Sequence, residues 1–436
     1  MSPSRDGLFR GKWEYFFIII FIAINLCGIN WQVLQLRGDR VRTDVRKALA
    51  TLYLTSFLVL GVASCGGGST VSGGGPGGSG GGPGGGSGGG ASAGEYLWEF
   101  SLTDDGLFLS TVNSSTGQLG APTDSGGVAC NSLGTIPSIA VAPSNTFAFV
   151  IDKCLTSIHS YSISGPGVAL AEISQSPFFL PGTLDSIAID PSGKFLYAVG
   201  TVPGAIYQLD INASTGELTL LSTTMETADL RAVVADPNGN FIFVNDLTGG
   251  HIFAYLVGGG SSLASVPGSP FTVPSNGQPV DLVMASGGKF LYAPLFSGGI
   301  AGFSVNSSTG ALSVVPGSPF PTSNQPFALA VDSSGGFLYS IGGSSNNTIE
   351  GFSMDANTGA LTAIMGSPFN APSPLSSLAV DPSGKFLYAT VQTATLPDSV
   401  IFGFAIDPSD GSLSALATSP YPAPPFPVDV VSLNIP

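Results

Sequence analysis

The sequence predicts an all-β fold, a seven-bladed β-propeller closed by a C-terminal strand, from three observations: a repeated block, its constant spacing and its two hairpins. The block returns six times; one copy reads SIAIDPSGKFLYAVG over residues 186–200 and another reads LAVDPSGKFLYATV from Leu378. Its aligned phenylalanines lie 46 to 49 residues apart, at Phe147, Phe195, Phe241, Phe290, Phe337 and Phe386. A repeat of this length built from short strands is typical of a propeller, with one blade per repeat.

The first hairpin of a blade is read from the block itself. Residues 186–189 are small and mostly apolar, and residues 195–199 (FLYAV) suit a pleated strand. Between them, residues 190–193 (DPSG) form a turn, in which proline fixes φ and glycine supplies a positive φ. We therefore expect two antiparallel strands at each copy of the block.

The second hairpin follows after a variable loop. Residues 205–211 are expected to form the third strand, and residues 213–216 (ASTG) turn into a fourth strand that starts at Glu217. The pattern recurs seven times, with leucines at positions 119, 170, 218, 263, 312, 361 and 413. A tail such as residues 317–320 (GSPF) leads to the next blade, and its proline is expected to end strand pairing there.

The numbers of hairpins predict how the ring closes. The complete first hairpin occurs six times and the second hairpin seven times, so one inner strand is missing. Residues 428–433 (VDVVSL) can supply it and complete the blade begun by residues 95–120. Such closure removes the two open sheet edges that would otherwise invite aggregation.

The composition divides the chain into four parts. Residues 1–40 form an apolar N-terminal extension, 41–65 a signal peptide, 66–94 a Gly/Ser-rich linker that can form no core, and 95–436 the propeller. The propeller holds 24 acidic and five basic residues, a net charge near −19. This charge argues against nucleic acid and anionic lipid as partners, and it fits a solubility coat on a secreted monomer.

An export signal precedes the linker. Its basic start comprises Arg40, Arg42, Arg46 and Lys47. An apolar run over residues 48–60 follows and ends in Val-Ala-Ser-Cys at 62–65, which resembles the lipobox of bacterial lipoproteins. We therefore expect Cys65 to be acylated and to anchor the propeller in the cell envelope. Gly66 stands where an aspartate would favour retention in the inner membrane, which favours the outer membrane.

A second apolar run, residues 15–29, lies upstream of this signal and is short for a membrane span. Two hypotheses remain open. Residues 1–40 lie upstream of the true translation start, or they form a real N-terminal span.

Two cysteines lie in the propeller, Cys130 in a connector before an inner strand and Cys154 just after the next second strand. Loops of these two kinds emerge on the same face of a propeller. Because an exported protein meets an oxidising compartment, we expect a disulfide between them. The alternative is two free buried thiols.

The repeated blocks resemble those of a known family. Residues 190–197, 211–218 and 381–388 are similar to the blade motifs of lactonase-type seven-bladed propellers, which include bacterial 6-phosphogluconolactonases and muconate-cyclising enzymes. The resemblance covers residues 95–436 and extends to YVTN-type surface-layer propellers. It implies lactone hydrolysis at a channel mouth that carries His, Arg and Glu.

This chain departs from that pattern at the channel mouth. Its two histidines, His159 and His251, fall on third strands, away from the axis, where a structural role is expected. The propeller has a single arginine, Arg231, at the start of an inner strand with Asp229 close by in sequence. Comparable positions in other blades hold Asp185, Asp281 and Asp429.

These four residues, Asp185, Arg231, Asp281 and Asp429, are the candidate ligand-binding residues at the channel mouth, and no catalytic residue is assigned. An arginine among carboxylates can bind a polar ligand such as a sugar, or it can brace adjacent blades as a structural ion pair, which we favour. The segments 355–357 and 407–411 resemble calcium loops faintly, but turn chemistry explains them. The sequence holds no zinc-spaced Cys/His set, so neither a metal nor a cofactor is expected.

The sequence therefore predicts an exported cell-envelope propeller that binds a protein or carbohydrate ligand or acts as a scaffold. The alternative is a lactonase-like hydrolase that acts on a sugar lactone. The missing channel-mouth histidine and the scarcity of arginine separate the two.

Overall fold

The computed structural model describes residues 94–101, 106–127, 138–152, 156–164, 169–202, 204–258, 262–342, 347–372, 374–391, 399–424 and 427–435. All of them lie in one compact unit, Gly82–Pro436. The expectations for the extension, signal peptide, linker, Cys65, Cys130 and Cys154 fall outside the described residues. Among the residues that are described, no helix is both long and apolar enough to cross a membrane.

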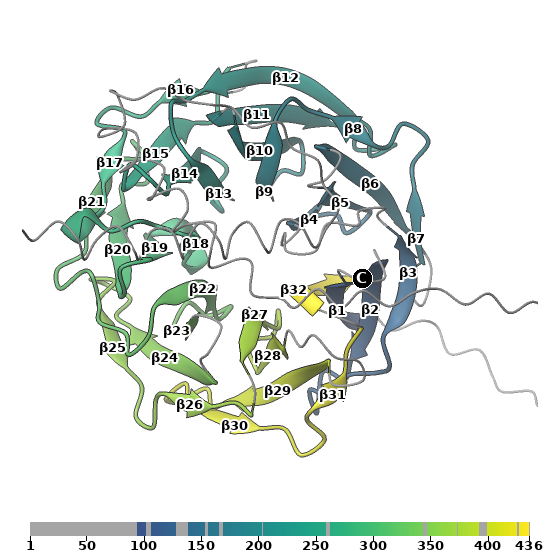
Figure 1. Ribbon diagram of the computed structural model, residues 1–436, viewed down its shortest axis with the longest axis vertical. Helices are drawn as coiled ribbons and strands as arrows, with labels where there is room; N and C mark the ends of the chain where they lie inside the picture. The colour runs from purple at the N-terminus through teal and green to yellow at the C-terminus, as the bar shows by residue number, and fades with distance from the viewer. Residues whose placement is uncertain are drawn as a thin grey trace, which may run out of the picture. The chain divides into compact units, whose positions relative to one another are not determined.

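The described residues form seven antiparallel sheets arranged as the blades of a ring, which Figure 1 shows in face view. The seven-bladed all-β propeller predicted from the repeats is confirmed. We number the blades 1 to 7 in chain order, and blade 1 is the blade that combines the first and the last strands of the propeller.

The strands of the first four blades are as follows. Blade 1 comprises β1 (Gly94–Ser101), β2 (Gly106–Val112), β3 (Thr123–Gly127) and β32 (Pro427–Ile435). Blade 2 comprises β4 (Ile139–Val141), β5 (Phe147–Asp152), β6 (Ser157–Ser164), β7 (Ala169–Glu172) and β8 (Phe178–Phe179). Blade 3 comprises β9 (Thr183–Ile189), β10 (Phe195–Val202), β11 (Gly204–Ile211) and β12 (Leu218–Met225). Blade 4 comprises β13 (Leu230–Ala235), β14 (Phe241–Asp246), β15 (His251–Leu256), β16 (Ala264–Ser265) and β17 (Phe271–Thr272).

The other three blades follow the same order. Blade 5 comprises β18 (Val283–Met284), β19 (Phe290–Pro294), β20 (Ile300–Val305) and β21 (Leu312–Val314), with short 3-10 turns at Pro274–Asn276 and Ser286–Gly288. Blade 6 comprises β22 (Pro326–Val331), β23 (Phe337–Gly342), β24 (Thr348–Met354), β25 (Leu361–Ala363) and β26 (Phe369–Asn370). Blade 7 comprises β27 (Leu375–Val380), β28 (Phe386–Val391), β29 (Val400–Ile406), β30 (Leu413–Ala415) and β31 (Tyr421–Pro422).

The ring closes as the sequence predicts. Strand β32 pairs antiparallel with β1, from Gly94 opposite Ile435 to Ser101 opposite Pro427. Blade 1 therefore combines an inner strand from the C-terminal end with three strands from the beginning of the propeller, in the order β3-β2-β1-β32. The closing strand is longer at both ends than the predicted segment 428–433.

The turns explain why each repeat folds locally as two hairpins. In blade 3, the buried Asp190 accepts hydrogen bonds from the backbone N–H groups of Ser192 and Phe195, at 3.1 and 2.6 Å. Gly193 follows with φ of 71° and Gly216 in the outer turn with φ of 73°, a backbone conformation that favours glycine. The predicted turns at 190–193 and 213–216 are confirmed.

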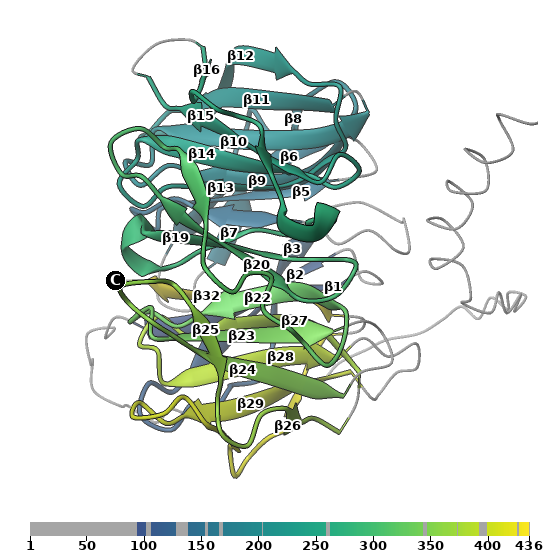
Figure 2. The ribbon, with the colours of Figure 1, turned by 90° about the vertical axis from the view of Figure 1, so that its left-hand side faces the viewer.

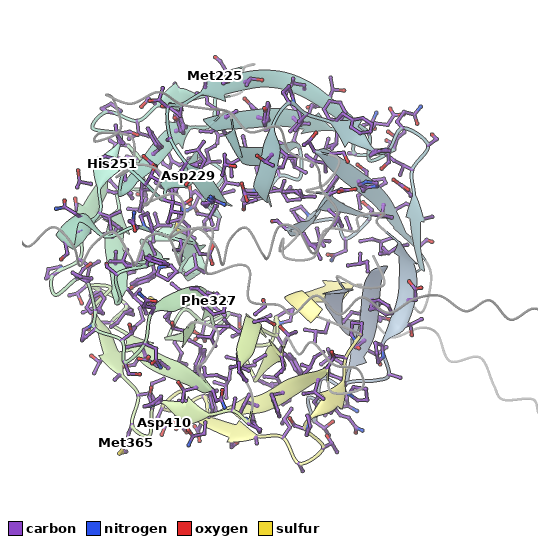
Figure 3. All side chains as sticks on the ribbon, in the orientation of Figure 1. Met225, Asp229, His251, Phe327, Met365 and Asp410 are labelled. Carbon is purple, nitrogen blue, oxygen red and sulfur yellow. The ribbon has the colours of Figure 1, made fainter. Side chains whose placement is uncertain are left out.

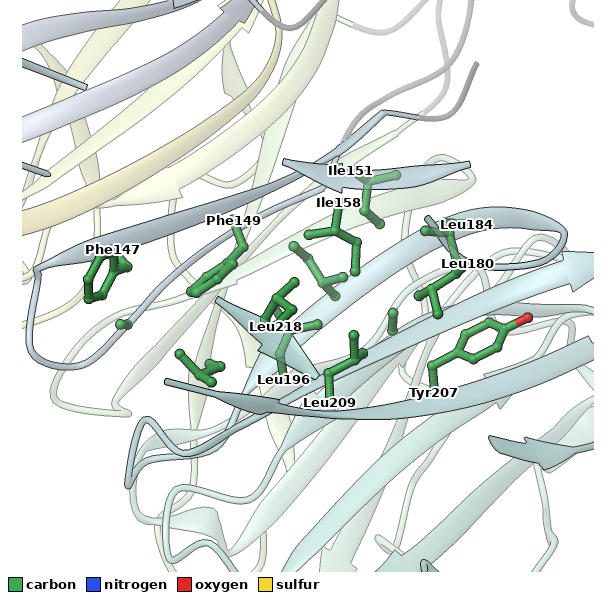
Figure 4. Close-up of a cluster of buried hydrophobic side chains, with 14 of the residues drawn as sticks. Phe147, Phe149, Ile151, Ile158, Leu180, Leu184, Leu196, Tyr207, Leu209 and Leu218 are labelled. Carbon is green, nitrogen blue, oxygen red and sulfur yellow. The ribbon is translucent and has the colours of Figure 1, made fainter. Parts of the chain in front are cut away.

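The hydrophobic core lies between neighbouring blades. Figure 4 shows the cluster between blades 2 and 3, where Phe149 and Ile158 of blade 2 face Leu196 and Leu209 of blade 3; all four side chains are fully buried. Side chains on both faces of a blade are therefore covered by its neighbours, which explains why the second strands read as continuous apolar runs.

Two repeated motifs meet at five of the blade interfaces within the described residues. The glycine of an outer turn packs against the phenylalanine that begins the second strand of the preceding blade. The described pairs are Gly117 with Phe386, Gly216 with Phe147, Gly310 with Phe241, Gly359 with Phe290 and Gly411 with Phe337. A Cβ atom at Gly216 would lie 2.5 Å from a ring carbon of Phe147, so only glycine fits there.

The prediction that proline ends pairing in the tail is wrong. In five blades the aromatic residue after the proline returns to the third strand: Phe178 lies opposite Ile158, Phe271 opposite Ile252, Phe320 opposite Ile300, Phe369 opposite Ile349 and Tyr421 opposite Ile401. The serine before the proline accepts a hydrogen bond from the third strand, as in Gly351 N–H to Ser367 Oγ at 3.0 Å. The hydroxyl satisfies this N–H of the third strand where the tail turns, and pairing with the third strand resumes at the aromatic residue after the proline.

Candidate functional site

Three of the four candidate residues predicted at the channel mouth lie in inner strands. Asp185 lies in β9 of blade 3, Arg231 in β13 of blade 4 and Asp429 in β32 of blade 1, while Asp281 lies two residues before β18 of blade 5. Figure 3 labels Asp229, which lies on the inner side of blade 4, and His251, which lies farther from the ring centre. The structure therefore distributes the candidates over four different blades.

Arg231 and two aspartates form one ion-paired cluster. The Nε of Arg231 donates to Oδ1 of Asp229 at 2.8 Å, and its Nη2 donates to Oδ2 of the same carboxylate at 3.4 Å. Its Nη1 lies 3.6 Å from Oδ1 of Asp185, which belongs to the neighbouring blade. The guanidinium therefore bridges blades 3 and 4, which is the geometry expected of a brace.

A buried asparagine positions this arginine. The inner strand β13 has an irregular register between Leu230 and Val233, where it bulges away from β14. Asn245 Oδ1 accepts from the N–H groups of both Arg231 and Ala232, at 3.1 and 2.6 Å. Its Nδ2 donates to the carbonyl of Pro279 at 2.7 Å, in the connector to blade 5. Because Asn245 is fully buried, it holds the bulge in one conformation.

Asp246, the next residue, fixes the segment before Arg231. Its Oδ1 accepts from the N–H groups of Asp229 and Gly249, at 3.2 and 3.0 Å. Its Oδ2 lies 3.8 Å from Nδ1 of His251, a contact that joins the end of β14 to the start of the third strand β15. Sequence reasoning missed both Asn245 and Asp246; the signal was present as two adjacent polar residues at the end of an otherwise apolar second strand (FIFVND).

The charges around Arg231 limit what this cluster can bind. One guanidinium, 39% exposed, is paired with two carboxylates, so the cluster of Arg231, Asp185 and Asp229 carries a net negative charge. A phosphate or carboxylate ligand would have to displace Asp229 from a two-point contact. The exposed part of the guanidinium and the carboxylate oxygens can still form hydrogen bonds with a neutral polyhydroxylated ligand.

The other two candidates lie in blades 5 and 1. Asp281 Oδ1 accepts from the backbone N–H of Leu282 at 2.8 Å. Asp429 lies opposite Phe100 in the pairing of β32 with β1, and its side chain is outside what the structure describes.

Both histidines lie on third strands, as the sequence predicts. His159 in β6 is buried, with Nδ1 2.7 Å from Oε1 of Glu172 and Nε2 3.7 Å from Oδ2 of Asp152. Its ring stacks on Tyr161, with 6.4 Å between ring centroids. These contacts tie β5, β6 and β7 of blade 2 together, which is a structural role. Over the described part of the chain, no group of three or more His, Cys, Asp or Glu residues is placed to hold a metal ion.

Comparisons with known proteins agree with this architecture. The family model described as Lactonase, 7-bladed beta-propeller matches residues 261–376. No curated protein matches the chain by sequence. The resemblance to lactonase-type seven-bladed propellers that the sequence predicts is confirmed over these residues.

Solved structures share the fold over nearly their whole length. The periplasmic gluconolactonase of Pseudomonas aeruginosa is 18% identical, covers 79% of this chain and 100% of its own, and superimposes with a TM-score of 0.64. A protein from Lactobacillus plantarum is 21% identical, with 78% and 100% coverage and a TM-score of 0.61. A Bacteroides fragilis protein described as a candidate 6-phosphogluconolactonase is 16% identical, with 79% and 99% coverage and a TM-score of 0.65. At such identities the likeness establishes the fold alone.

Proposed function

We propose that this chain is an exported, lactonase-like propeller that acts in the cell envelope as a binding or scaffold module. The observation that carries the proposal is the pairing of Arg231 with two carboxylates. The single arginine of the propeller is held by Asp229 at 2.8 Å and faces Asp185 of the preceding blade at 3.6 Å. It serves the ring as a brace and is not free to serve as an anion clamp.

Chemical requirements of lactone hydrolysis support this choice. The reaction needs a group that activates water and a cation or donor that holds the developing oxyanion. Both histidines are on third strands and contact carboxylates of their own blades. The candidate residues for these two roles at the channel mouth are Arg231, Asp185, Asp281 and Asp429. Three of the four are carboxylates, whose negative charge opposes the developing oxyanion.

Export and anchoring are part of the same proposal. The lipobox-like segment ending in Cys65 would place the propeller at the cell envelope through a lipid. A location outside the cytoplasm is supported by the structural neighbour from Pseudomonas aeruginosa, which is a periplasmic protein. In a Cys65→Ser chain we expect the propeller to lose its partition into detergent. If the variant partitions like the wild type, the anchor lies elsewhere, for example in residues 15–29.

The second candidate function is hydrolysis of a sugar lactone. The match of residues 261–376 to a lactonase family and the gluconolactonase neighbour favour it. In that case Arg231 and Asp185 would bind the substrate at the channel mouth, and Arg231 would exchange an aspartate for the substrate oxygen.

Turnover measured on the full chain separates the two functions. We expect hydrolysis of 6-phosphogluconolactone and of gluconolactone to stay at the spontaneous rate. Turnover that is abolished by Arg231→Ala or Asp185→Asn, and retained in a Glu172→Gln control in blade 2, would establish the hydrolase and overturn the binding module. The control residue lies on β7, in the outer part of its blade.

A further inference from the structure

The outer strand of blade 3 differs from those of the other blades. Strand β12 runs unbroken over eight residues, Leu218–Met225, whereas β16, β21, β25 and β30 have two or three residues. In those four blades a Ser-Pro tail folds back and adds a second short piece to the outer edge. Blade 3 has no Ser-Pro tail, and Figures 1 and 2 show β12 as a long ribbon at the rim of the ring.

Strand β12 has backbone groups available for a further strand. It ends the sheet order β12-β11-β10-β9, so one of its sides has no strand partner within the described residues. The N–H of Glu226 donates to the carbonyl of Gly204 in β11, at 2.8 Å. Because successive residues of a strand alternate, Thr223 and Met225 direct their N–H and C=O groups away from β11. A bulge between Leu220 and Ser222 limits the regular stretch to the C-terminal half of the strand.

The side chains of β12 provide little protection for this edge. The segment Leu218–Met225 has no charged residue and no proline, the two residue types that usually block strand addition. Leu220 is 40% exposed and Met225 58% exposed. A long, uncharged and partly apolar edge of this kind is suited to β-augmentation, in which an extended segment adds to a sheet.

A second copy of this chain is a poor occupant. Antiparallel pairing of two β12 strands over their whole length would run across the bulge of each strand and would place Glu217 of one copy opposite Glu226 of the other, at both ends. Like charges directly opposite each other are destabilising, and each propeller carries a net charge near −19. The same two glutamates favour a strand whose ends are basic.

We infer that β12 is the docking edge for an extended segment of another protein, with uncharged, β-branched or apolar residues in its centre and Lys or Arg at its ends. Hydrogen bonds from Thr223 and Met225 would supply the backbone contacts, and Leu220 and Met225 the apolar ones. This inference names the surface and the partner for the proposed binding function and rests on it. Its test is separate, since β12 lies on the outer rim and contributes nothing to the channel mouth.

A displayed library of random peptides of about ten residues, selected on the full chain, tests the inference. The key variant is Thr223→Pro, which keeps the ladder to β11 because the N–H of Thr223 faces outward, but removes a donor from the free side. Thr223→Ala is the matched control because it keeps that N–H. Met225→Lys is a second variant, which adds a charge to the edge without a change of the backbone.

We expect the selected peptides to lack proline, to alternate in side-chain type and to end in Lys or Arg. They should bind the wild type and Thr223→Ala equally, and Thr223→Pro and Met225→Lys about tenfold more weakly, with unchanged melting temperatures. Bound peptide should slow hydrogen exchange at residues 219–225.

Four results would overturn the inference. They are failure to select any peptide, equal binding by Thr223→Pro and the wild type, protection from exchange outside blade 3, and selected peptides with acidic ends. Self-association of the full chain that Thr223→Pro abolishes would show that a second copy occupies the edge, and would overturn the choice of partner. None of these results bears on lactone turnover, so failure here is distinguishable from failure of the proposed function.

Discussion

Blades 6 and 3 begin with nearly the same block, LAVDSSGGFLYSIG and SIAIDPSGKFLYAVG, yet their outer halves differ. In blade 6 the buried Tyr339 lies opposite Gly351 on the third strand, and Phe369 of the tail packs beside that glycine. In blade 3 the equivalent Tyr197 lies opposite Gln208, which is fully buried. The blade with glycine has a folded-back tail, and the blade with glutamine has the long edge strand β12.

The difference shows that one position on the third strand is linked to the form of the whole outer edge. A Cβ at Gly351 would lie 3.1 Å from Phe369 and 3.1 Å from Ile364, so a side chain as long as glutamine would compete with the tail for space. Small side chains are accommodated, because blades 2 and 4 have Ser160 and Ala254 at this position and keep a folded-back tail. In blade 3 that space is taken by the glutamine side chain, whose Oε1 accepts from Ser222 of β12 at 3.2 Å. The glutamine therefore occupies the space that a Ser-Pro tail fills in blade 6. Blade 3 has a continuous outer strand in place of an outer edge covered by a tail.

The largest effect is expected from a change on which both blades depend, the closure of the ring. Deletion of residues 428–436 removes almost all of β32 and leaves β1 as an open edge. We expect a loss comparable to the whole stability of a domain, about 5–15 kcal/mol, seen as aggregation or absence of a cooperative melt. A chain that lacks only Pro436 is the control. A normal melt of the longer deletion would show that blades 3 and 6 do not need a closed ring.

An exchange between the two blades tests the link directly. Gly351→Gln places the blade 3 residue in blade 6, where the tail leaves no room, and should cost about 3 kcal/mol in chemical unfolding. The reciprocal change, Gln208→Gly, meets no such tail and should cost about 1–2 kcal/mol, through the lost hydrogen bond with Ser222 and the greater backbone freedom of glycine. Equal losses in the two variants would contradict the proposed competition between side chain and tail.

The buried tyrosines provide a smaller contrast. The hydroxyl of Tyr339 donates to the carbonyl of Gly411 in blade 7 at 2.8 Å, whereas the hydroxyl of Tyr197 has no hydrogen-bond partner among the described residues. Tyr339→Phe should therefore cost about 1 kcal/mol, and Tyr197→Phe should be neutral or slightly stabilising. Phe149 and Phe243 already occupy this position in blades 2 and 4, so both variants should fold.

The same tyrosines predict an alkaline limit. Burial raises the pKa of Tyr197, Tyr292 and Tyr339 well above the usual value of 10.0. The stability that they contribute is complete below about pH 10 and is lost as the pH rises toward their folded-state pKa values. Unfolding curves between neutral pH and about pH 11 should show this loss, and Tyr339→Phe should reduce it. An equal alkaline loss in Tyr339→Phe and in the wild type would assign it to other groups.

The smallest effect concerns the outer turns. Hydrogen bonds from the backbone N–H groups of Thr358 and Asn357 lower the pKa of Asp355 in blade 6, while blade 3 has Asn212 at the same place. The contribution of Asp355 is present above its ordinary pKa of 3.8 and is lost as the pH falls through the lowered value. Asp355→Asn should leave the melting temperature at pH 7 unchanged and should remove this acid dependence. A lower melting temperature at pH 7 would show that the charge itself matters to the turn.

Most of the fold could be predicted because each repeat contains the turn and strand residues that determine its own hairpins. The turn residues Asp190 and Gly193, the outer glycine Gly216 and the apolar second strand act within a few residues of one another, so the hairpins follow from their spacing. Even the closing strand was predictable, because an incomplete repeat at one end needs a complement at the other. The fold class, the number of blades and the hairpin pattern are therefore what the sequence determined by itself.

The site was less predictable, because its contacts join residues that are far apart in the sequence. The tertiary structure alone decided that Arg231 pairs with Asp185 of the neighbouring blade, that Asn245 holds the bulge beneath it, and that the tails fold back onto third strands. It also decided that no strand of the described residues pairs with the outer side of β12, since that depends on how the rest of the ring folds. Local turn conformation is set by neighbours in sequence, whereas ion pairs between blades depend on the packing of the whole ring. The same packing decides whether the edge of a strand is paired or exposed.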